Sequence, residues 1–91
     1  MANYYFTNKA VSDLEQIWDY TYNNWTERQA DKYYNELVIA CKKISKNPEI
    51  GKKYIKIFPD LYGMHVNHHI IFFRRIEAET VENTRILFYT K

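Results

Sequence analysis

The sequence predicts an α+β domain in which a pair of helices packs on one face of a mainly antiparallel sheet. Three observations predict it: two amphipathic segments in the first half, a very short connection between them, and extended apolar segments in the second half. The order strand, two helices, four strands is typical of folds that segregate helices to one face of a sheet. We expect residues 1–91 to form one domain, because this length supports one modest hydrophobic core.

The first half of the chain predicts one short strand and two helices. Asn3–Phe6 is rich in aromatic residues, which favours a strand. Thr7 can cap a helix, and apolar residues then recur at three- and four-residue spacing over about residues 8–23. A Thr-x-x-Gln capping box starts a second helix at Thr26, and Asn47-Pro48 ends it. With two or three residues between them, the helices must fold back as a hairpin.

The second half predicts a run of four strands. The expected strands are Tyr54–Phe58, Tyr62–Val66, His69–Ile76 and Val81–Tyr89. Asn67-His68 fits a two-residue turn, because asparagine tolerates positive φ, and Glu77–Thr80 is a polar turn. The segment Ile70–Phe73 is apolar on both faces, which indicates a central strand that is covered on each side. The first strand should pair with one of these four, but periodicity does not indicate which one.

Composition and charge restrict the class of protein. With 46% hydrophobic and 18% aromatic residues, the chain should fold rather than remain disordered. The N-terminus lacks a signal-peptide pattern and no apolar run approaches the roughly 18 residues of a membrane span, so we expect no membrane association. The single cysteine, Cys41, lies on the apolar face of the second helix, so it should pack in the core. A lone cysteine also fits a reducing cytoplasm.

The charge is distributed unevenly along the chain. Residues 1–41 carry three basic and six acidic side chains, whereas residues 42–91 carry ten basic and five acidic ones. The C-terminal half should therefore attract an acidic partner.

Four sequence blocks, in order and with matching spacing, resemble the ParE branch of the ParE/RelE superfamily of type II toxin–antitoxin toxins. The matching residues are Phe6, Thr7, Ala10, Asp13, Leu14, Ile17, Trp18 and Tyr20, then Gln29, Ala30, Tyr33 and Leu37, then Asn47, Pro48 and Gly51, and finally Pro59, Leu61, Val66, His69, Ile71, Phe72 and Arg74. Any one block is common, but all four in series are fairly specific. The chain departs from the pattern at Tyr62-Gly63, at Asn67-His68 and after Leu87, and it ends at Lys91.

The resemblance implies a cytoplasmic toxin of the plasmid-stabilisation type that forms a hetero-oligomer with a cognate antitoxin. ParE-like members bind and inhibit DNA gyrase, so their function depends on a surface and not on a catalytic centre. Two alternatives remain open. A RelE-like ribosome-dependent mRNA endonuclease would use basic and aromatic residues, but the tail that carries the final pair in that branch is expected to be absent here. The other alternative is an inactive member that binds its antitoxin and regulates its operon. The nuclease candidates are Lys53, Lys56, Arg74, Tyr89 and Lys91.

Candidate partner-binding residues come from the basic half and from one tryptophan. They are Lys52, Lys53, Lys56, Arg74, Arg85 and Trp25. Antitoxins of this superfamily usually present an acidic amphipathic segment, so charge reversal of the three lysines should weaken the complex. The alternative interpretations are arginines solvated on the sheet, and Trp18 and Trp25 as anchors of the helix pair. Direct binding of nucleic acid is not expected.

The histidines of the third block suggest a metal site, but their spacing argues against one. Alternate residues of a strand point to opposite faces, and no carboxylate or thiol lies nearby at ligand spacing. We therefore expect no metal and no cofactor. One of His65, His68 and His69 should pack in the sheet while the others are solvated.

Overall fold

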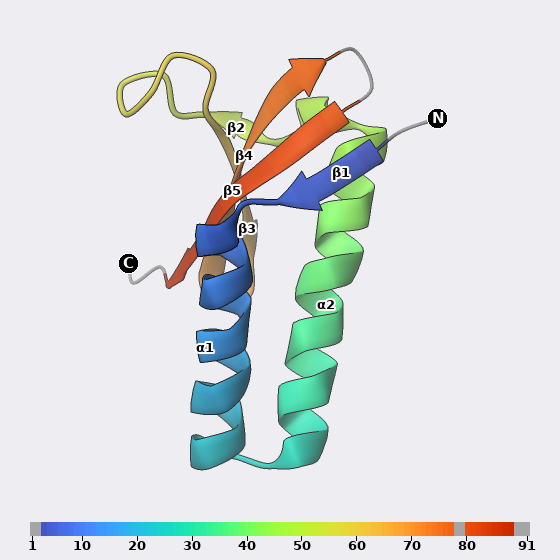
Figure 1. Ribbon diagram of the computed structural model, residues 1–91, viewed down its shortest axis with the longest axis vertical. Helices are drawn as coiled ribbons and strands as arrows, with labels where there is room; N and C mark the ends of the chain where they lie inside the picture. The colour runs from blue at the N-terminus through green and yellow to red at the C-terminus, as the bar shows by residue number, and fades with distance from the viewer. Residues whose placement is uncertain (1–2, 78–79, 89–91) are drawn as a thin grey trace.

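A helical hairpin and a five-stranded sheet form two layers in the computed structural model, which describes residues 3–77 and 80–88 (Figure 1). The elements in chain order are β1 Asn3–Phe6, α1 Asn8–Asn24, α2 Glu27–Lys46, the 3-10 turn η1 Pro48–Ile50, β2 Lys52–Lys53, β3 Tyr62–Val66, β4 His69–Glu77 and β5 Thr80–Phe88. The predicted α+β class is confirmed.

The helices begin where the sequence predicts. The Thr7 side chain accepts a hydrogen bond from the Ala10 N–H at 3.1 Å, and the Thr26 side chain accepts one from the Gln29 N–H at 3.1 Å. These caps satisfy backbone donors that have no partner within a helix. α2 ends at Lys46, directly before Asn47-Pro48. Two residues separate the helices, so they fold back on one another as predicted (Figure 1).

The strands follow the order β1-β5-β4-β3-β2, and only the β1–β5 pair is parallel. β1 pairs with β5 from Thr80 to Asn83 and no further. Thr7, which follows β1, continues the contact: its N–H donates to the Asn83 carbonyl at 3.1 Å and its hydroxyl to the Thr84 carbonyl at 2.7 Å. On its other edge β5 stays paired with β4 as far as Phe88, but on the β1 side its C-terminal part lies beside α1 and not beside a strand.

The core lies between the helices and the inner face of the sheet. Leu37, Ile44, Ile71 and Phe73 are among its fully buried side chains. Cys41 is also fully buried in this core, as predicted, and burial raises the pKa of its thiol to about 12.

Both faces of β4 are covered, as its apolar sequence predicts. Ile71 and Phe73 belong to the core under the helices. On the other face, the Tyr54 ring packs edge-on against Phe72, with 5.3 Å between ring centroids. A Cβ added to Gly63 would lie 2.8 Å from the Tyr54 ring, so the glycine makes room for this packing.

The predicted strand Tyr54–Phe58 is wrong. The strand in this region, β2, is Lys52–Lys53, and residues 54–61 form a loop. Ile55 and Ile57 alternate with Lys56 as in a strand, yet the side chains of Ile55, Ile57 and Phe58 are all exposed, so no buried face supports an extended conformation. Local hydrogen bonds hold the turn instead: the N–H groups of Ile57 and Phe58 both donate to the Tyr54 carbonyl.

The β3–β4 turn is the predicted pair Asn67-His68, with Asn67 at φ 54°. The turn expected at Glu77–Thr80 falls partly on residues 78–79, which lie outside the described residues; Glu77 and Thr80 themselves pair across β4 and β5. β5 reaches Phe88, and Tyr89, its predicted last residue, lies outside the described part of the chain.

Candidate partner-binding groove

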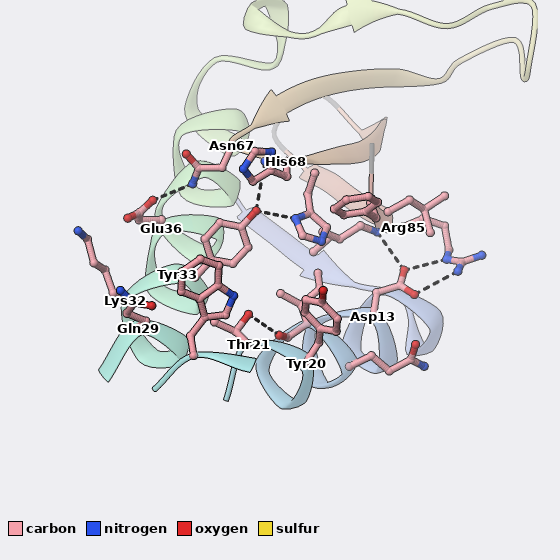
Figure 2. Close-up of a pocket in the computed structure, with 17 residues that line it drawn as sticks. Asp13, Tyr20, Thr21, Gln29, Lys32, Tyr33, Glu36, Asn67, His68 and Arg85 are labelled. Carbon is pink, nitrogen blue, oxygen red and sulfur yellow. Dashed lines mark hydrogen bonds and ion pairs between the residues drawn. The ribbon is translucent and has the colours of Figure 1, made fainter. Parts of the chain in front are cut away.

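An open groove lies between the helical hairpin, the β3–β4 turn and the end of β5 (Figure 2). Its volume is about 770 Å³. The lining side chains are Asp13, Gln16, Ile17, Tyr20, Thr21 and Trp25 from α1 and its C-terminus, Gln29, Lys32, Tyr33 and Glu36 from α2, and Asn67, His68, His69, Arg85, Ile86, Leu87 and Phe88 from the sheet. The lining therefore combines aromatic side chains with a small number of charged groups, as is typical of binding sites.

The α1 side of the groove is fixed to β5 by Asp13. Its carboxylate accepts hydrogen bonds from Arg85 Nε at 2.8 Å, Arg85 Nη2 at 3.1 Å and the backbone N–H of Ile86 at 3.0 Å (Figure 2). Asp13 thus accepts a hydrogen bond from the β5 backbone at Ile86, beyond the residues of β5 that pair with β1. Its hydrogen bond and charge raise the pKa of the Arg85 guanidinium. The Asp13 side chain is only 9% exposed, whereas the Arg85 side chain is 39% exposed, so the fork-shaped contact has a buried carboxylate and a guanidinium that is open to solvent.

The other side of the groove is fixed by Tyr33 of α2. The Tyr33 hydroxyl lies 2.6 Å from His69 Nδ1 and accepts a hydrogen bond from the His68 N–H at 3.3 Å (Figure 2). Nearby, Asn67 Nδ2 donates to Glu36 Oε2 at 2.8 Å. The β3–β4 turn is therefore held against α2 by side chains from both elements.

His69 is the histidine that packs, while His65 and His68 are exposed, as predicted. Its ring lies between Tyr33 and Phe88, with centroids 5.4 and 5.5 Å away. Burial, and to a lesser extent the charge of His68, lowers the pKa of His69. Burial likewise raises the pKa of Tyr33. Both rings therefore favour their neutral forms, which lets the Tyr33 hydroxyl donate to Nδ1.

Large aromatic side chains stand exposed along the groove. Tyr20 and Trp25 are each 66% exposed, and Phe88 is 65% exposed. The interpretation of Trp25 as a core or helix-pair anchor is wrong, because its side chain is mostly exposed at the C-terminus of α1. Trp18 does anchor the pair: its Nε1 donates to Asp31 Oδ1 on α2 at 3.0 Å. Exposed aromatic clusters of this kind mark protein interfaces.

A sequence model described as the ParE toxin of the type II toxin–antitoxin system parDE matches residues 4–87. The chain belongs to the ParE toxin family. It is 33% identical over 86 residues to Toxin ParE1 of Mycobacterium tuberculosis, covering 94% of this chain and 88% of that protein. It is also 27% identical over 74 residues to Toxin ParE1 of Caulobacter vibrioides, covering 81% and 77%.

The fold agrees with this ParE assignment. A solved structure of the chromosomal ParDE toxin–antitoxin system from P. aeruginosa aligns with a TM-score of 0.82, over 99% of this chain and 97% of that one. At 20% sequence identity, the match establishes a shared fold.

In this ParE-family chain, the sequence-predicted partner residues fall in two places. Trp25 and Arg85 line the groove. Lys52, Lys53 and Lys56 are exposed on β2 and the following loop, and none of them lines the groove. Arg74 belongs with these lysines, because its guanidinium lies 5.4 Å from the centroid of the Phe58 ring in that loop.

The residues proposed for a nuclease are not all described. Lys53 and Lys56 are exposed, and Arg74 also forms a 4.0 Å ion pair with Glu82. Tyr89 and Lys91 lie outside the described residues. Among residues 3–77 and 80–88, no group of three or more histidine, cysteine or acidic side chains is placed to hold a metal ion. Over the same residues, no helix is long and apolar enough to cross a membrane.

The sequence predictions missed Asp13, Tyr33 and His69 as site residues. Asp13 carried a signal: it is an acidic residue placed among the apolar positions of α1, between Ala10, Leu14 and Ile17. A buried carboxylate needs a partner, so that position indicates a polar contact across the fold.

Proposed function

We propose that this chain is a cytoplasmic ParE-like toxin that binds and inhibits DNA gyrase and is neutralised by a cognate antitoxin. Membership of the ParE family supports the class of activity. The observation that carries the antitoxin part is the groove with its exposed Tyr20, Trp25 and Phe88 side chains. On this proposal, a segment of the antitoxin buries these side chains and withdraws the toxin from its target.

The chemistry of the groove suits an amphipathic segment with acidic residues. Its apolar surface, which includes Ile17 and Leu87, would receive the apolar face of a helix or an extended peptide. Lys32 lines the same groove and is exposed, so it is available to an acidic side chain at the edge. A disordered antitoxin tail would order as it binds and bury the aromatic side chains.

The antitoxin part predicts that Trp25→Ala weakens the toxin–antitoxin complex by about tenfold or more, because exposed tryptophans in grooves are frequent hot spots. The binding partner to test is an antitoxin-like protein sought in the neighbouring reading frame, and calorimetry measures its Kd for the toxin. Ile39→Ala is the matched control, since Ile39 is exposed on α2 but does not line the groove. Equal affinity of the Trp25 variant and the wild type would remove the groove from the proposal.

The gyrase part predicts a surface-based inhibitor without a reaction centre. Purified toxin should block DNA supercoiling by purified gyrase, and it should leave ribosome-bound mRNA intact in primer-extension assays. Active supercoiling together with ribosome-dependent mRNA cuts would favour the nuclease alternative. Failure of both assays, with antitoxin binding preserved, would indicate a member that only binds its antitoxin.

A further inference from the structure

The loop Tyr54–Leu61, here called the apolar loop, exposes large hydrophobic side chains far from the groove. Ile55 is 62% exposed, Ile57 66% and Phe58 51%. Single exposed apolar residues are ordinary on protein surfaces, but three within four consecutive positions form a patch that usually has a partner.

Hydrogen bonds within the apolar loop hold it in one conformation. Its two ends are joined by the Tyr54 N–H, which donates to the Leu61 carbonyl at 2.8 Å. Inside it, the Ile57 N–H donates to the Tyr54 carbonyl at 3.0 Å, and the Leu61 N–H donates to the Phe58 carbonyl at 3.2 Å. Compact surface loops with closed ends are often functional. A loop that is already ordered also pays little conformational entropy when it binds.

Side chains fasten both ends of the loop to the outer face of the sheet. Leu61 is buried, and the Tyr54 ring fills the space above Gly63 and contacts Phe72. The Arg74 guanidinium covers Phe58. Ile55 and Ile57 are therefore presented on a rigid support, and their exposure is not a consequence of loose packing.

The charge around the loop is mainly positive. Lys52 and Lys53 precede it, Lys56 lies within it, and all three side chains are exposed. The acidic residue in this segment, Asp60, does not balance them. An apolar centre with a basic border is complementary to a protein surface that has an apolar recess and an acidic border.

The apolar loop and the groove are separate surfaces. None of the residues that line the groove belongs to segment 52–61. In Figure 1 the loop, drawn in yellow, projects from the end of the molecule opposite the α1–α2 connection. Two different partners can therefore contact the two surfaces.

We propose that the apolar loop is the surface that docks on the target protein, with Ile55 and Ile57 entering an apolar recess and the lysines facing its acidic border. This inference rests on the proposed function, in which the target is gyrase. It reassigns Lys52, Lys53 and Lys56 from the antitoxin to the target. A protein is favoured over nucleic acid because the two most exposed side chains of the patch, Ile55 and Ile57, are aliphatic and the Phe58 ring is covered by Arg74, whereas single-stranded nucleic acid is usually bound on aromatic stacking platforms.

The test compares Ile55→Ser/Ile57→Ser and Lys56→Glu with Ile39→Ser, a control that is 52% exposed on α2. Thermal unfolding confirms that each variant is folded. Inhibition of purified gyrase, the Kd for the antitoxin, the Kd for plasmid DNA alone and growth arrest on induction are then measured. The double loop variant should need about tenfold more protein for half-inhibition, as expected for a hot spot, while its antitoxin affinity stays within about twofold.

Other results would contradict either the loop as the target-binding surface or the proposed inhibition of gyrase. Unchanged inhibition by the double variant, or a matching loss of antitoxin affinity, overturns the loop as target surface. If the wild type binds plasmid DNA and the loop variants do not, the loop is a nucleic-acid-binding surface, and the proposal of a protein-binding loop is wrong. If the wild type leaves gyrase active, the proposed function fails. The loop is then tested by comparing the growth arrest caused by the wild type with that caused by the loop variants. Weaker arrest by the loop variants then supports another protein target, and unchanged or absent arrest overturns the inference.

Discussion

At the scale of single residues, Asp13 shows how one side chain connects two elements that are distant in the sequence. It lies on α1 but makes its three hydrogen bonds to Arg85 and Ile86 of β5. Beyond Asn83 one edge of β5 has no neighbouring strand, although β4 pairs with the other edge, and the backbone groups of an open edge need another partner. Asp13 supplies that partner for Ile86 and fixes the α1 side of the groove.

Replacing Asp13 with alanine should lower the free energy of unfolding by about 1–3 kcal/mol, because it leaves the Ile86 N–H without an acceptor and Arg85 without its counter-charge. Urea denaturation measures the change. Asp13→Asn should cost less, since an amide oxygen still accepts from the Ile86 N–H. An alanine variant within about 0.5 kcal/mol of the wild type, the usual range for surface substitutions, would show that the contact contributes little.

His69 should make stability depend on pH. Its pKa is lower in the folded chain than the ordinary value of 6.5, mainly through burial. The unfolded chain therefore binds the proton more tightly, so the free energy of unfolding decreases as the pH falls through and below 6.5. Protonation would also place a charge beside His68 and remove the acceptor for the Tyr33 hydroxyl.

The measurement is urea denaturation at pH 7.5 and pH 5.5 for the wild type and His69→Gln. The variant should lose less stability on acidification than the wild type, because glutamine does not titrate. His65→Gln serves as the control, since His65 is exposed and is not among the groups that shift the pKa of His69. Identical pH dependence of the wild type and His69→Gln would contradict the assignment.

At the scale of elements, Gly51 determines how η1 connects to β2. Its φ of −80° is open to any residue, so conformational freedom does not require glycine there. A Cβ at this position would overlap the ring of Phe73, which is fully buried. The glycine is therefore needed for close approach of the backbone to the core.

Gly51→Ala should destabilise the protein by about 1–3 kcal/mol, the usual cost of overpacking a core. Combining it with Phe73→Leu should cost less than the sum of the two single variants, because the smaller side chain leaves space for the methyl group. Thermal denaturation of the four proteins in this cycle measures the coupling. Strict additivity would indicate that the cost comes from the backbone and not from contact with Phe73.

The sequence predicted the helices well because their signals are local. Thr7 and Thr26 are caps, Asn47-Pro48 is a stop signal, and apolar residues follow the helical period between them. The strand predicted after Gly51 was wrong because the contacts that determine its conformation are not visible in the local pattern. The alternation of Ile55 and Ile57 is the same in a strand and in this loop. The loop is stabilised by the Tyr54–Leu61 hydrogen bond and by the packing of the Tyr54 ring over Gly63.

At the scale of the whole molecule, the candidate site was predicted in part. Trp25 and Arg85 were chosen from residue type and charge, and both line the groove. Asp13 and Tyr33 were not, because their partners lie 72 and 36 residues away and no spacing rule connects them. Residue type therefore identified candidates for binding, whereas only the fold separated the groove from the apolar loop.

Two surfaces on one short chain provide a physical basis for the proposed toxin, which is held inactive by one protein and acts on another. The groove collects exposed aromatic side chains between the hairpin and β5, and the apolar loop presents aliphatic side chains with a basic border on the sheet side. On this account the chain needs no catalytic centre, because binding alone inhibits the target.

The most direct test of this account is a supercoiling titration with purified gyrase, relaxed plasmid and increasing amounts of toxin, with and without the antitoxin. Supercoiling should be lost as the toxin is added, and it should be restored when the antitoxin is present in equal amount. Supercoiling that continues unchanged at a large excess of folded toxin would contradict it.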